Sequence, residues 1–352
     1  MRYARGRAST GFPMDDLIIN LLGPTQVLRL PDAESGAASA IPPPSHPSRQ
    51  VAHLLAYLVL GGRGTYERDE LADLFWGDQG MERARRSLST AVWRLRKTIE
   101  PEPVPHGTYL ATHGGEALGF NWESRHRIDV IEFESVLDRH LSVPPQRLGR
   151  ADATALADGL ALYRGDFLSG GRIGWALTER ERLAERYLDG LSHLMRHKFY
   201  VGEYQQGIQI GQRILERDPL REDIHRDLMR LHVRTGHRSR AIRQYRDCSD
   251  VLERELQIAP DAETRNTYDE IRRGDPQAAA EPAPVPDRAP EGSPDLDPQP
   301  TPDQALVCLT RALAEVERAR RAAERVFGRD RTFSIIARSR ALAGDAAGQR
   351  QP

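Results

Sequence analysis

Residues 83–99 read RARRSLSTAVWRLRKTI, and the periodicity of this stretch decides the fold. An α-helix advances about 100° per residue, which places the small and apolar side chains of this stretch within a sector of roughly 100°. These side chains belong to Ala84, Leu88, Ala91, Val92, Leu95 and Ile99. The opposite sector carries Arg83, Arg86, Thr90, Trp93, Arg94 and Lys97, with Arg85, Ser89 and Arg96 at its borders. The pattern predicts a helix with one buried and one strongly polar face.

The charge of this helix has only one sign. Residues 83–99 contain six cations and no acid. Helices normally offset such charge with acidic side chains three or four positions away, so this face should repel itself unless an anion lies opposite. A phosphate backbone would be such an anion. A solvated basic face without a ligand is the alternative interpretation.

The segments around this helix give it a structural context. Apolar residues recur with helical spacing in residues 49–60 and 67–76, and two strand-like segments, 109–112 and 117–122, flank the pair Gly114-Gly115. Two short helices, a third helix and a glycine-tipped hairpin occur in the order of a winged helix-turn-helix domain. In such a domain the third helix enters the major groove of DNA and the hairpin lies along the backbone.

The polar face carries side chains suited to duplex DNA. Arginine can hold guanine O6 and N7 through two parallel hydrogen bonds, and the hydroxyls of Ser89 and Thr90 can reach base edges or phosphates. Trp93 is a large apolar ring in the middle of this face. It has two interpretations, contact with a thymine methyl group or a sugar, or a structural role folded back against the hairpin.

Residues 128–271 predict an almost wholly helical region with a repeat of tetratricopeptide length. Gly202-Glu203-Tyr204 recurs 34 residues later as Gly236-His237-Arg238, and isoleucine follows at the matching position each time. Asp218-Pro219 and Ala259-Pro260 are predicted helix starts, because proline is tolerated in a first turn. Stacked helix pairs of this kind form a concave surface that binds a protein or peptide.

The composition divides the chain into successive parts. Residues 275–303 hold nine prolines, seven acids and one arginine, so they cannot bury enough apolar surface to fold and are predicted to be a disordered linker. After this linker, apolar residues recur at spacings of three and four, which predicts a further helix. This helix could pair with its own copy, dock on the repeats or bind a third protein. Docking on the repeats is favoured, because about three heptads with the charged Arg320 in the apolar seam make only a marginal coiled coil on their own. The predicted parts are a tail (1–15), a winged helix that begins with two strands (16–125), the repeats (127–274), the linker (275–303) and a helix (304–343).

The net charge conceals an uneven distribution. Lys plus Arg total 50 and Asp plus Glu total 51, so the net charge is −1, which argues against a uniformly basic nucleic-acid binder. Residues 83–99, however, carry +6, and the linker carries seven acids against one arginine, which is −6. We therefore expect opposite charges in separate segments, and a linker that competes with DNA for the basic face.

Several classes of function have no support in the sequence. No stretch approaches the 18 to 20 apolar residues, roughly, of a membrane span, and the start lacks the apolar core of a signal peptide, so we expect a cytoplasmic protein without a membrane partner. His193 and His197 lack a third ligand at motif spacing, and Cys248 and Cys308 form no metal motif, which predicts reduced thiols and no metal. A phosphate-binding loop and a nucleophile with its base are absent as well, so we expect no cofactor and no enzyme.

Dispersed motifs carry a resemblance to a known family. In the first half they are Leu21–Pro24, His53–Leu58, Leu74–Asp78, Ala84–Leu88 and Trp93–Lys97. They resemble the DNA-binding domain of the streptomycete antibiotic regulatory proteins, an OmpR-type winged helix. In the second half Asp129, Tyr163–Leu168, Asp218–Glu222 and Ala241–Tyr245 resemble the bacterial transcriptional activator domain of the same family, which is built on tetratricopeptide repeats. The resemblance covers residues 17–273 in the order of the family.

The resemblance implies a mainly α protein with a small β component. It further implies a transcriptional activator that binds direct repeats in a promoter as a homodimer and recruits RNA polymerase holoenzyme. The family's contacts with double-stranded DNA carry over to Arg83, Arg86, Ser89, Thr90, Trp93, Arg94 and Lys97. The wing departs from the family pattern, because Gly114-Gly115-Glu116 holds no basic residue and His113 is the only candidate there. This departure motivates the alternative function, a protein-interaction adaptor whose winged helix does not bind DNA.

Overall fold

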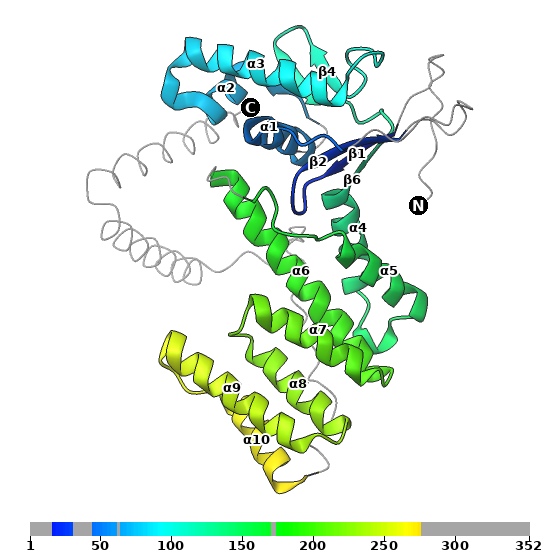
Figure 1. The fold of residues 1–352 in the computed structure, drawn as a ribbon, viewed down its shortest axis with the longest axis vertical. Coiled ribbons are helices and arrows are strands. Elements are labelled where there is room, and N and C mark those ends of the chain that lie inside the picture. Colours follow the sequence, from blue (N-terminus) through cyan, green and yellow to red (C-terminus); the bar gives the residue numbers. More distant parts are fainter. Residues whose placement is uncertain (1–15, 31–43, 62–63, 170–173, 276–352) are drawn as a thin grey trace, which may run out of the picture. The chain divides into compact units, whose positions relative to one another are not determined.

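The computed structural model describes residues 16–30, 44–61, 64–169 and 174–275 (Figure 1). Within these ranges the chain is mainly helical and has two small three-stranded sheets, which confirms the predicted fold class. The segments predicted as an N-terminal tail and a C-terminal helix lie outside the described residues, as does the predicted linker apart from Asp275.

The first part of the chain combines three helices with the strands of both sheets. The helices are α1 (Arg49–Leu60), α2 (Arg68–Trp76) and α3 (Met81–Ile99). One sheet has the order β2-β1-β6 and is built from β1 (Asp16–Asn20), β2 (Gln26–Leu30) and β6 (His126–Ile128). The other has the order β3-β5-β4 and is built from β3 (Tyr66–Glu67), β4 (Leu110–His113) and β5 (Ala117–Phe120). The β4–β5 hairpin follows α3, so the order predicted for a winged helix is confirmed.

The buried face of α3 packs on the other two helices. The predicted apolar stripe from Ala84 to Ile99 is buried, and its most exposed member, Val92, is 7% exposed. Leu54 of α1, Leu71 of α2 and Leu118 of β5 belong to the same hydrophobic core. Burial of such side chains contributes roughly 1.5 to 3 kcal/mol each, so the core fixes which side of α3 faces solvent.

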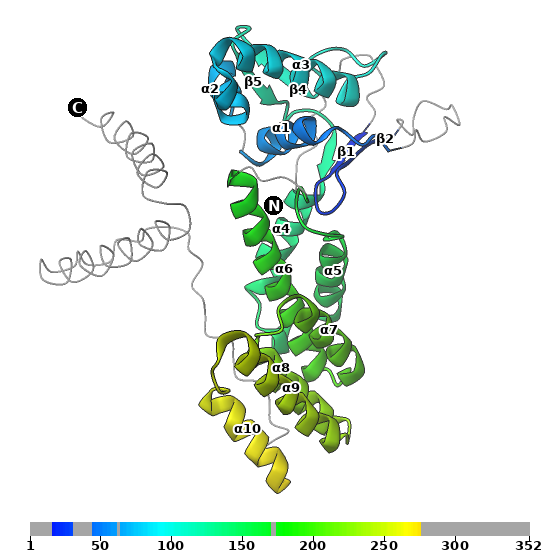
Figure 2. The ribbon, with the colours of Figure 1, turned by 60° about the vertical axis from the view of Figure 1, so that its left-hand side comes forward.

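The second part is a succession of antiparallel helices, each packed against the next (Figure 2). They are α4 (Asp129–Leu141), α5 (Arg150–Ala161), α6 (Gly174–Tyr200), α7 (Tyr204–Arg217), α8 (Glu222–Arg234), α9 (Arg238–Leu256) and α10 (Ala262–Arg273). The predicted 34-residue repeat is present in the backbone. Gly202 and Gly236 have φ of +77° and +78°, and each lies between two helices of a pair. Glycine adopts this left-handed conformation without steric cost, which lets the chain reverse at the same point of both repeats.

The prolines proposed as helix starts have a different position. α8 begins at Glu222 and α10 at Ala262, so Pro219 and Pro260 lie in the preceding loops and not in the first turns. The start of α10 is set by Asp261, whose side chain accepts a hydrogen bond from the Thr264 backbone N–H at 2.6 Å. A capping carboxylate satisfies an N–H that has no partner within the helix. The prediction failed because proline is also tolerated in the loop before a helix, where no helical hydrogen bond needs its missing N–H.

A buried carboxylate joins the two parts. Asp129, the first residue of α4, is 4% exposed and accepts hydrogen bonds from the backbone N–H groups of Leu21, Leu22 and Val130 at 2.8 to 3.0 Å. Arg164 Nη2 lies 3.3 Å from the same carboxylate. Residues 126–128, at the predicted domain boundary, form β6 and pair with β1. The N-terminal sheet is therefore continuous with the start of the helical part.

Two glycines allow the backbones of the two parts to approach closely. Gly23 in the β1–β2 turn has φ of +111°, and a Cβ atom there would lie 3.3 Å from the Arg164 carbonyl carbon and the Gly165 nitrogen. A bridge between Leu22 and Phe167 continues the contact. The motifs around Gly23 and Gly165, far apart in sequence, thus pack against each other.

Candidate nucleic-acid interface

The polar face of α3 is open to solvent, and the structure places the predicted contact residues together on it. Arg83, Arg86, Ser89, Thr90, Trp93, Arg94 and Lys97 are all exposed. They share one side of a 19-residue helix whose other side is anchored in the core. Whether these side chains touch DNA stays a prediction at this point, but their common exposure is a structural fact.

Two of the six cations have acidic partners that the pattern within residues 83–99 could not show. Arg85 forms a two-pronged ion pair with Asp69 of α2, at 2.8 and 2.7 Å, and also contacts Glu82. Arg96 contacts Glu100 at 2.6 Å. The expectation that all six charges repel one another was therefore wrong, because acids from outside the stretch neutralise two of them. Arg85 and Arg96 both lie at a border of the polar face.

The other four cations have no ion pair within the described residues. They are Arg83, Arg86, Arg94 and Lys97. Arg86 uses Nε to donate to the Glu82 carbonyl at 3.2 Å, which leaves its terminal nitrogens available. The free charge of the face is thus about +4, and it is concentrated between the borders of the helix.

Glu100, directly after α3, fixes the position of the hairpin. Its side chain is fully buried and accepts hydrogen bonds from the backbone N–H groups of Gly107, Tyr109 and Leu110 at 2.8 to 3.1 Å. Arg96 joins this carboxylate to Thr112 of β4, to which it donates at 2.8 Å. Sequence reasoning missed this residue, although an acid at a helix end beside a cation four positions earlier is a visible signal.

The hydroxyl groups of the face are already engaged as donors. Ser89 donates to the Arg85 carbonyl at 2.9 Å and accepts from Arg68 of α2 at 3.1 Å. Thr90 donates to the Arg86 carbonyl at 3.0 Å. Because each hydroxyl has a single proton, in this conformation both groups can only accept from a ligand. They suit the amino groups of bases better than phosphate oxygens.

Trp93 extends into solvent. Its side chain is 57% exposed, and Lys97 Nζ lies 4.8 Å from the centre of its ring. The interpretation in which Trp93 folds back against the hairpin is therefore wrong, because more than half of the residue is open to solvent. A cation over an indole ring is an electrostatically favourable pair, and the two side chains present one apolar and charged surface.

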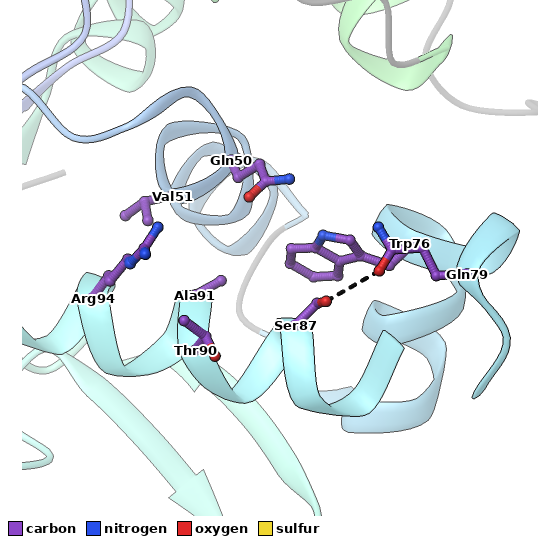
Figure 3. A pocket seen from close by; sticks show the side chains of 8 residues that line it. All are labelled: Gln50, Val51, Trp76, Gln79, Ser87, Thr90, Ala91 and Arg94. Atoms are coloured by element: carbon purple, nitrogen blue, oxygen red, sulfur yellow. Dashed lines mark hydrogen bonds between the residues drawn. The ribbon is translucent and has the colours of Figure 1, made fainter. Parts of the chain in front are cut away.

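A polar cleft of about 180 Å³ runs along the border of α3 that faces α1 (Figure 3). Figure 3 shows the Arg94 side chain directed from α3 toward Val51 of α1, and the Trp76 ring between Gln50 and Ser87. Ser87 donates to Gln79 of the α2–α3 connection at 3.2 Å. The first turn of α1, the α2–α3 connection and α3 therefore contribute to one continuous polar surface.

The hairpin contributes little charge to this surface. Gly114 and Gly115 form its tip with φ of +61° and +80°, and Glu116 follows them. His113 is exposed at the end of β4. The described hairpin, residues 110–120, has no lysine or arginine, so it adds no cation to the basic face of α3.

The chain is similar to known bacterial regulators. The family model of the bacterial transcriptional activator domain matches residues 128–272. The regulatory protein AfsR of Streptomyces coelicolor is 26% identical over 278 residues, which cover 76% of this chain and 26% of AfsR. The transcriptional regulator RedD of the same organism is 26% identical over 262 residues, which cover 73% of this chain and 71% of RedD. The chain therefore contains a segment that matches the bacterial transcriptional activator domain, and it is similar to regulators of the streptomycete antibiotic regulatory protein type.

A solved structure supports the fold of this chain. EmbR of Mycobacterium tuberculosis, in complex with a low-affinity phosphopeptide, has a TM-score of 0.58 at 20% identity. The similarity covers 75% of this chain and 66% of EmbR. The chain spans about a quarter of the length of AfsR, so the whole activity of that larger protein does not transfer directly.

Other titratable groups of the chain lie away from α3. His193 and His197 are buried in α6, and burial lowers the pKa of His193 to about 4. Burial raises the pKa of the Cys248 thiol to about 12, and Cys308 lies outside the described residues. Among the residues that the structure describes, no group of three or more potential ligands is arranged to hold a metal. The described helices also include none long and apolar enough to cross a membrane.

Proposed function

We propose that this regulator binds double-stranded promoter DNA with α3 in the major groove. One observation carries the proposal. On the exposed face that also holds Trp93, four cations of α3 have no ion pair with any residue that the structure describes, while the two cations at the border are paired. Concentrated unpaired positive charge on a rigid helix complements the phosphates and guanine edges of a groove. In this proposal Trp93 faces the bases, Arg86 and Lys97 lie within reach of both phosphates and base edges, and Arg94 lies beside the cleft at α1.

The similarity to AfsR and RedD suggests a more specific function. AfsR and RedD are a regulatory protein and a transcriptional regulator, so we propose that this chain is an activator. It would bind direct repeats as a homodimer and recruit RNA polymerase holoenzyme through its helical part, in the cytoplasm.

Binding of full-length protein to duplexes selected from random sequence tests the DNA contact. Arg86→Ala combined with Arg94→Ala should lower affinity by roughly two orders of magnitude, because each good arginine contact contributes about 1 to 3 kcal/mol. Arg85→Ala is the matched control, since its guanidinium is paired with Asp69 at a border of the face. Equal affinity of the double variant and the wild type would show that α3 is not the groove helix.

The salt dependence gives a second readout. If the four unpaired cations each neutralise one phosphate, the logarithm of affinity should fall with the logarithm of salt concentration with a slope of about −3.6 per protomer. The double variant should lower this slope by about 1.8. The wing carries Glu116 beside its two glycines and no lysine or arginine, which favours an adaptor as the second candidate function. An adaptor would show no salt-dependent retention on DNA while it still recovers a protein partner in pull-downs.

A further inference from the structure

A second cleft lies at the junction of the two parts, away from the open face of α3. Its volume is about 240 Å³. The lining residues come from the β1–β2 turn, from the first turn of α1 with its approach, and from the loop after α5. They are Gly23, Pro24, Thr25, His46, Pro47, Arg49, Ala52, His53, Leu168 and Ser169. An occupant of this cleft would contact both the winged helix and the helical part.

The walls of this junction cleft are held in place by hydrogen bonds. Val27 and Ser45 exchange two backbone hydrogen bonds, at 3.0 and 2.8 Å, which tie the approach to α1 onto β2. On the opposite wall Leu168 has φ of +45°, a conformation that costs a residue other than glycine about 1 to 3 kcal/mol. Arg180 holds this loop by donating to the carbonyl oxygens of Phe167 and Leu168 at 2.7 and 2.5 Å. Strain that surrounding contacts maintain at a concave site is typical of ligand-binding loops.

The lining of the junction cleft favours an anion. Its described lining contains no aspartate or glutamate, and Arg49 has no ion pair with a described residue. The 12-residue helix α1 begins at this arginine, and the side chain of Ser48 makes no capping hydrogen bond. The N–H groups of the first turn of α1 therefore lack side-chain acceptors, and the positive end of the helix dipole lies at the cleft.

His53 gives a second, independent observation: one of its ring nitrogens is buried without a hydrogen-bond partner among the described residues. The residue is 2% exposed and lines the cleft, and its Nε2 atom has no hydrogen-bond partner within the described residues. Nδ1 lies 2.7 Å from the Arg49 carbonyl, which only accepts, so Nδ1 carries the proton of the neutral ring. Burial lowers the pKa of His53, which keeps the ring neutral and Nε2 an acceptor. A buried acceptor without a donor calls for a hydroxyl or an ordered water.

We propose that the junction cleft binds a small anionic metabolite that carries a hydroxyl group, such as a hydroxycarboxylate or a phosphate ester of a polyol. The anionic oxygens lie at Arg49 and the first turn of α1, and the hydroxyl donates to His53 Nε2. Thr25 and Ser169 supply further hydroxyl contacts from the two walls. Because the ligand touches both parts, its binding stabilises their arrangement. This binding does not depend on whether α3 contacts DNA.

Calorimetric titration of the full-length protein with glycerate and with glycerol 3-phosphate tests the proposal and separates the two anion types. At least one should bind at a single site with a dissociation constant below about 10 mM and raise the melting temperature. Propionate and inorganic phosphate, which lack a carbon-bound hydroxyl, should bind at least about tenfold more weakly than the corresponding ligand. The Nε2 nitrogen resonance of His53 should shift on binding.

Two variants make the test specific to this cleft. Arg49→Gln should weaken binding by about tenfold or more, and it should fold normally because the arginine is exposed and has no ion pair. Arg147→Gln changes another exposed arginine, outside the cleft, and should bind like the wild type. The proposal is overturned if neither ligand binds, or if Arg49→Gln binds as tightly as the wild type, which would mean an adventitious ion. An unshifted His53 resonance in the bound state would equally exclude the assigned contact.

Discussion

Substitution Asp129→Ala should destabilise the junction of the two parts more than any nearby surface change. The Asp129 carboxylate accepts hydrogen bonds from the backbone N–H groups of Leu21, Leu22 and Val130 at 2.8 to 3.0 Å. Asp129 is only 4% exposed, so water has little access to these hydrogen bonds. An alanine leaves three buried donors without an acceptor, and it removes a negative charge from the N-terminus of α4.

The expected cost follows from these contacts. Each buried N–H left without a partner costs about 1 to 3 kcal/mol, so three of them give a minimum of about 3 kcal/mol. Water that enters the site in the variant can satisfy some of these N–H groups, so we expect the loss of unfolding free energy to lie near this minimum. For a folded unit of this size, 3 kcal/mol corresponds to a melting-temperature decrease of roughly 6 to 12 °C.

Thermal and urea unfolding followed by circular dichroism measure this cost. Arg164→Ala is the matched control, because it removes one contact of 3.3 Å to the same carboxylate from a side chain that is 45% exposed. Such a half-exposed pair contributes about 1 kcal/mol or less. If Asp129→Ala costs no more than Arg164→Ala, the carboxylate does not satisfy the three N–H groups, and the account of the junction is wrong.

Three further predictions concern stability and DNA contact. The pKa of His193 falls from 6.5 to about 4 in the folded protein, so the unfolded state takes up a proton first and stability should decrease by about 3 kcal/mol as the pH falls from 6.5 through 4. Urea midpoints against pH should show a smaller decrease for His193→Gln, and an identical pH dependence would contradict the burial argument. Gly23→Ala should lower the melting temperature more than Gly80→Ala, because both glycines have positive φ but only Gly23 has backbone atoms 3.3 Å from an added Cβ. Trp93→Ala should leave the melting temperature unchanged, since the ring is 57% exposed, and should weaken DNA binding in an anisotropy titration; unchanged affinity would remove Trp93 from the interface.

The elements and the buried stripe of α3 could be predicted because they depend on neighbours within the same helix. The period of Ala84, Leu88 and Leu95 is a local property of the sequence, and the burial of these residues agrees with it. The charge partners could not be predicted in the same way. Asp69 lies 16 residues before Arg85, and only the packing of α2 on α3 brings the two together.

The junction shows the same division between local and tertiary information. The motifs around Gly23 and Asp129 were visible in the sequence, but their roles depend on which backbones meet. A glycine with positive φ is expected at a turn, whereas the approach of Gly23 to Gly165 is a tertiary contact without a local signal. Likewise nothing adjacent to Asp129 shows that its carboxylate accepts from Leu21 and Leu22, which lie 108 and 107 residues away, respectively.

The paired and unpaired cations of α3 have complementary roles in the proposed interface. Arg85 connects one border of the helix to α2, and Arg96 connects the same border to Glu100 and the hairpin. These contacts fix the rotation of α3 about its axis before any ligand arrives, so the unpaired cations lose less conformational freedom on binding. They also reduce the free charge from +6 to about +4, which weakens the attraction available to a competing acidic segment. Self-inhibition by residues 275–303 therefore stays a prediction, and the attraction expected between this acidic segment and α3 is weaker than the sequence alone indicated. Deletion of residues 276–302 should raise DNA affinity most at low salt, where charge screening is weakest.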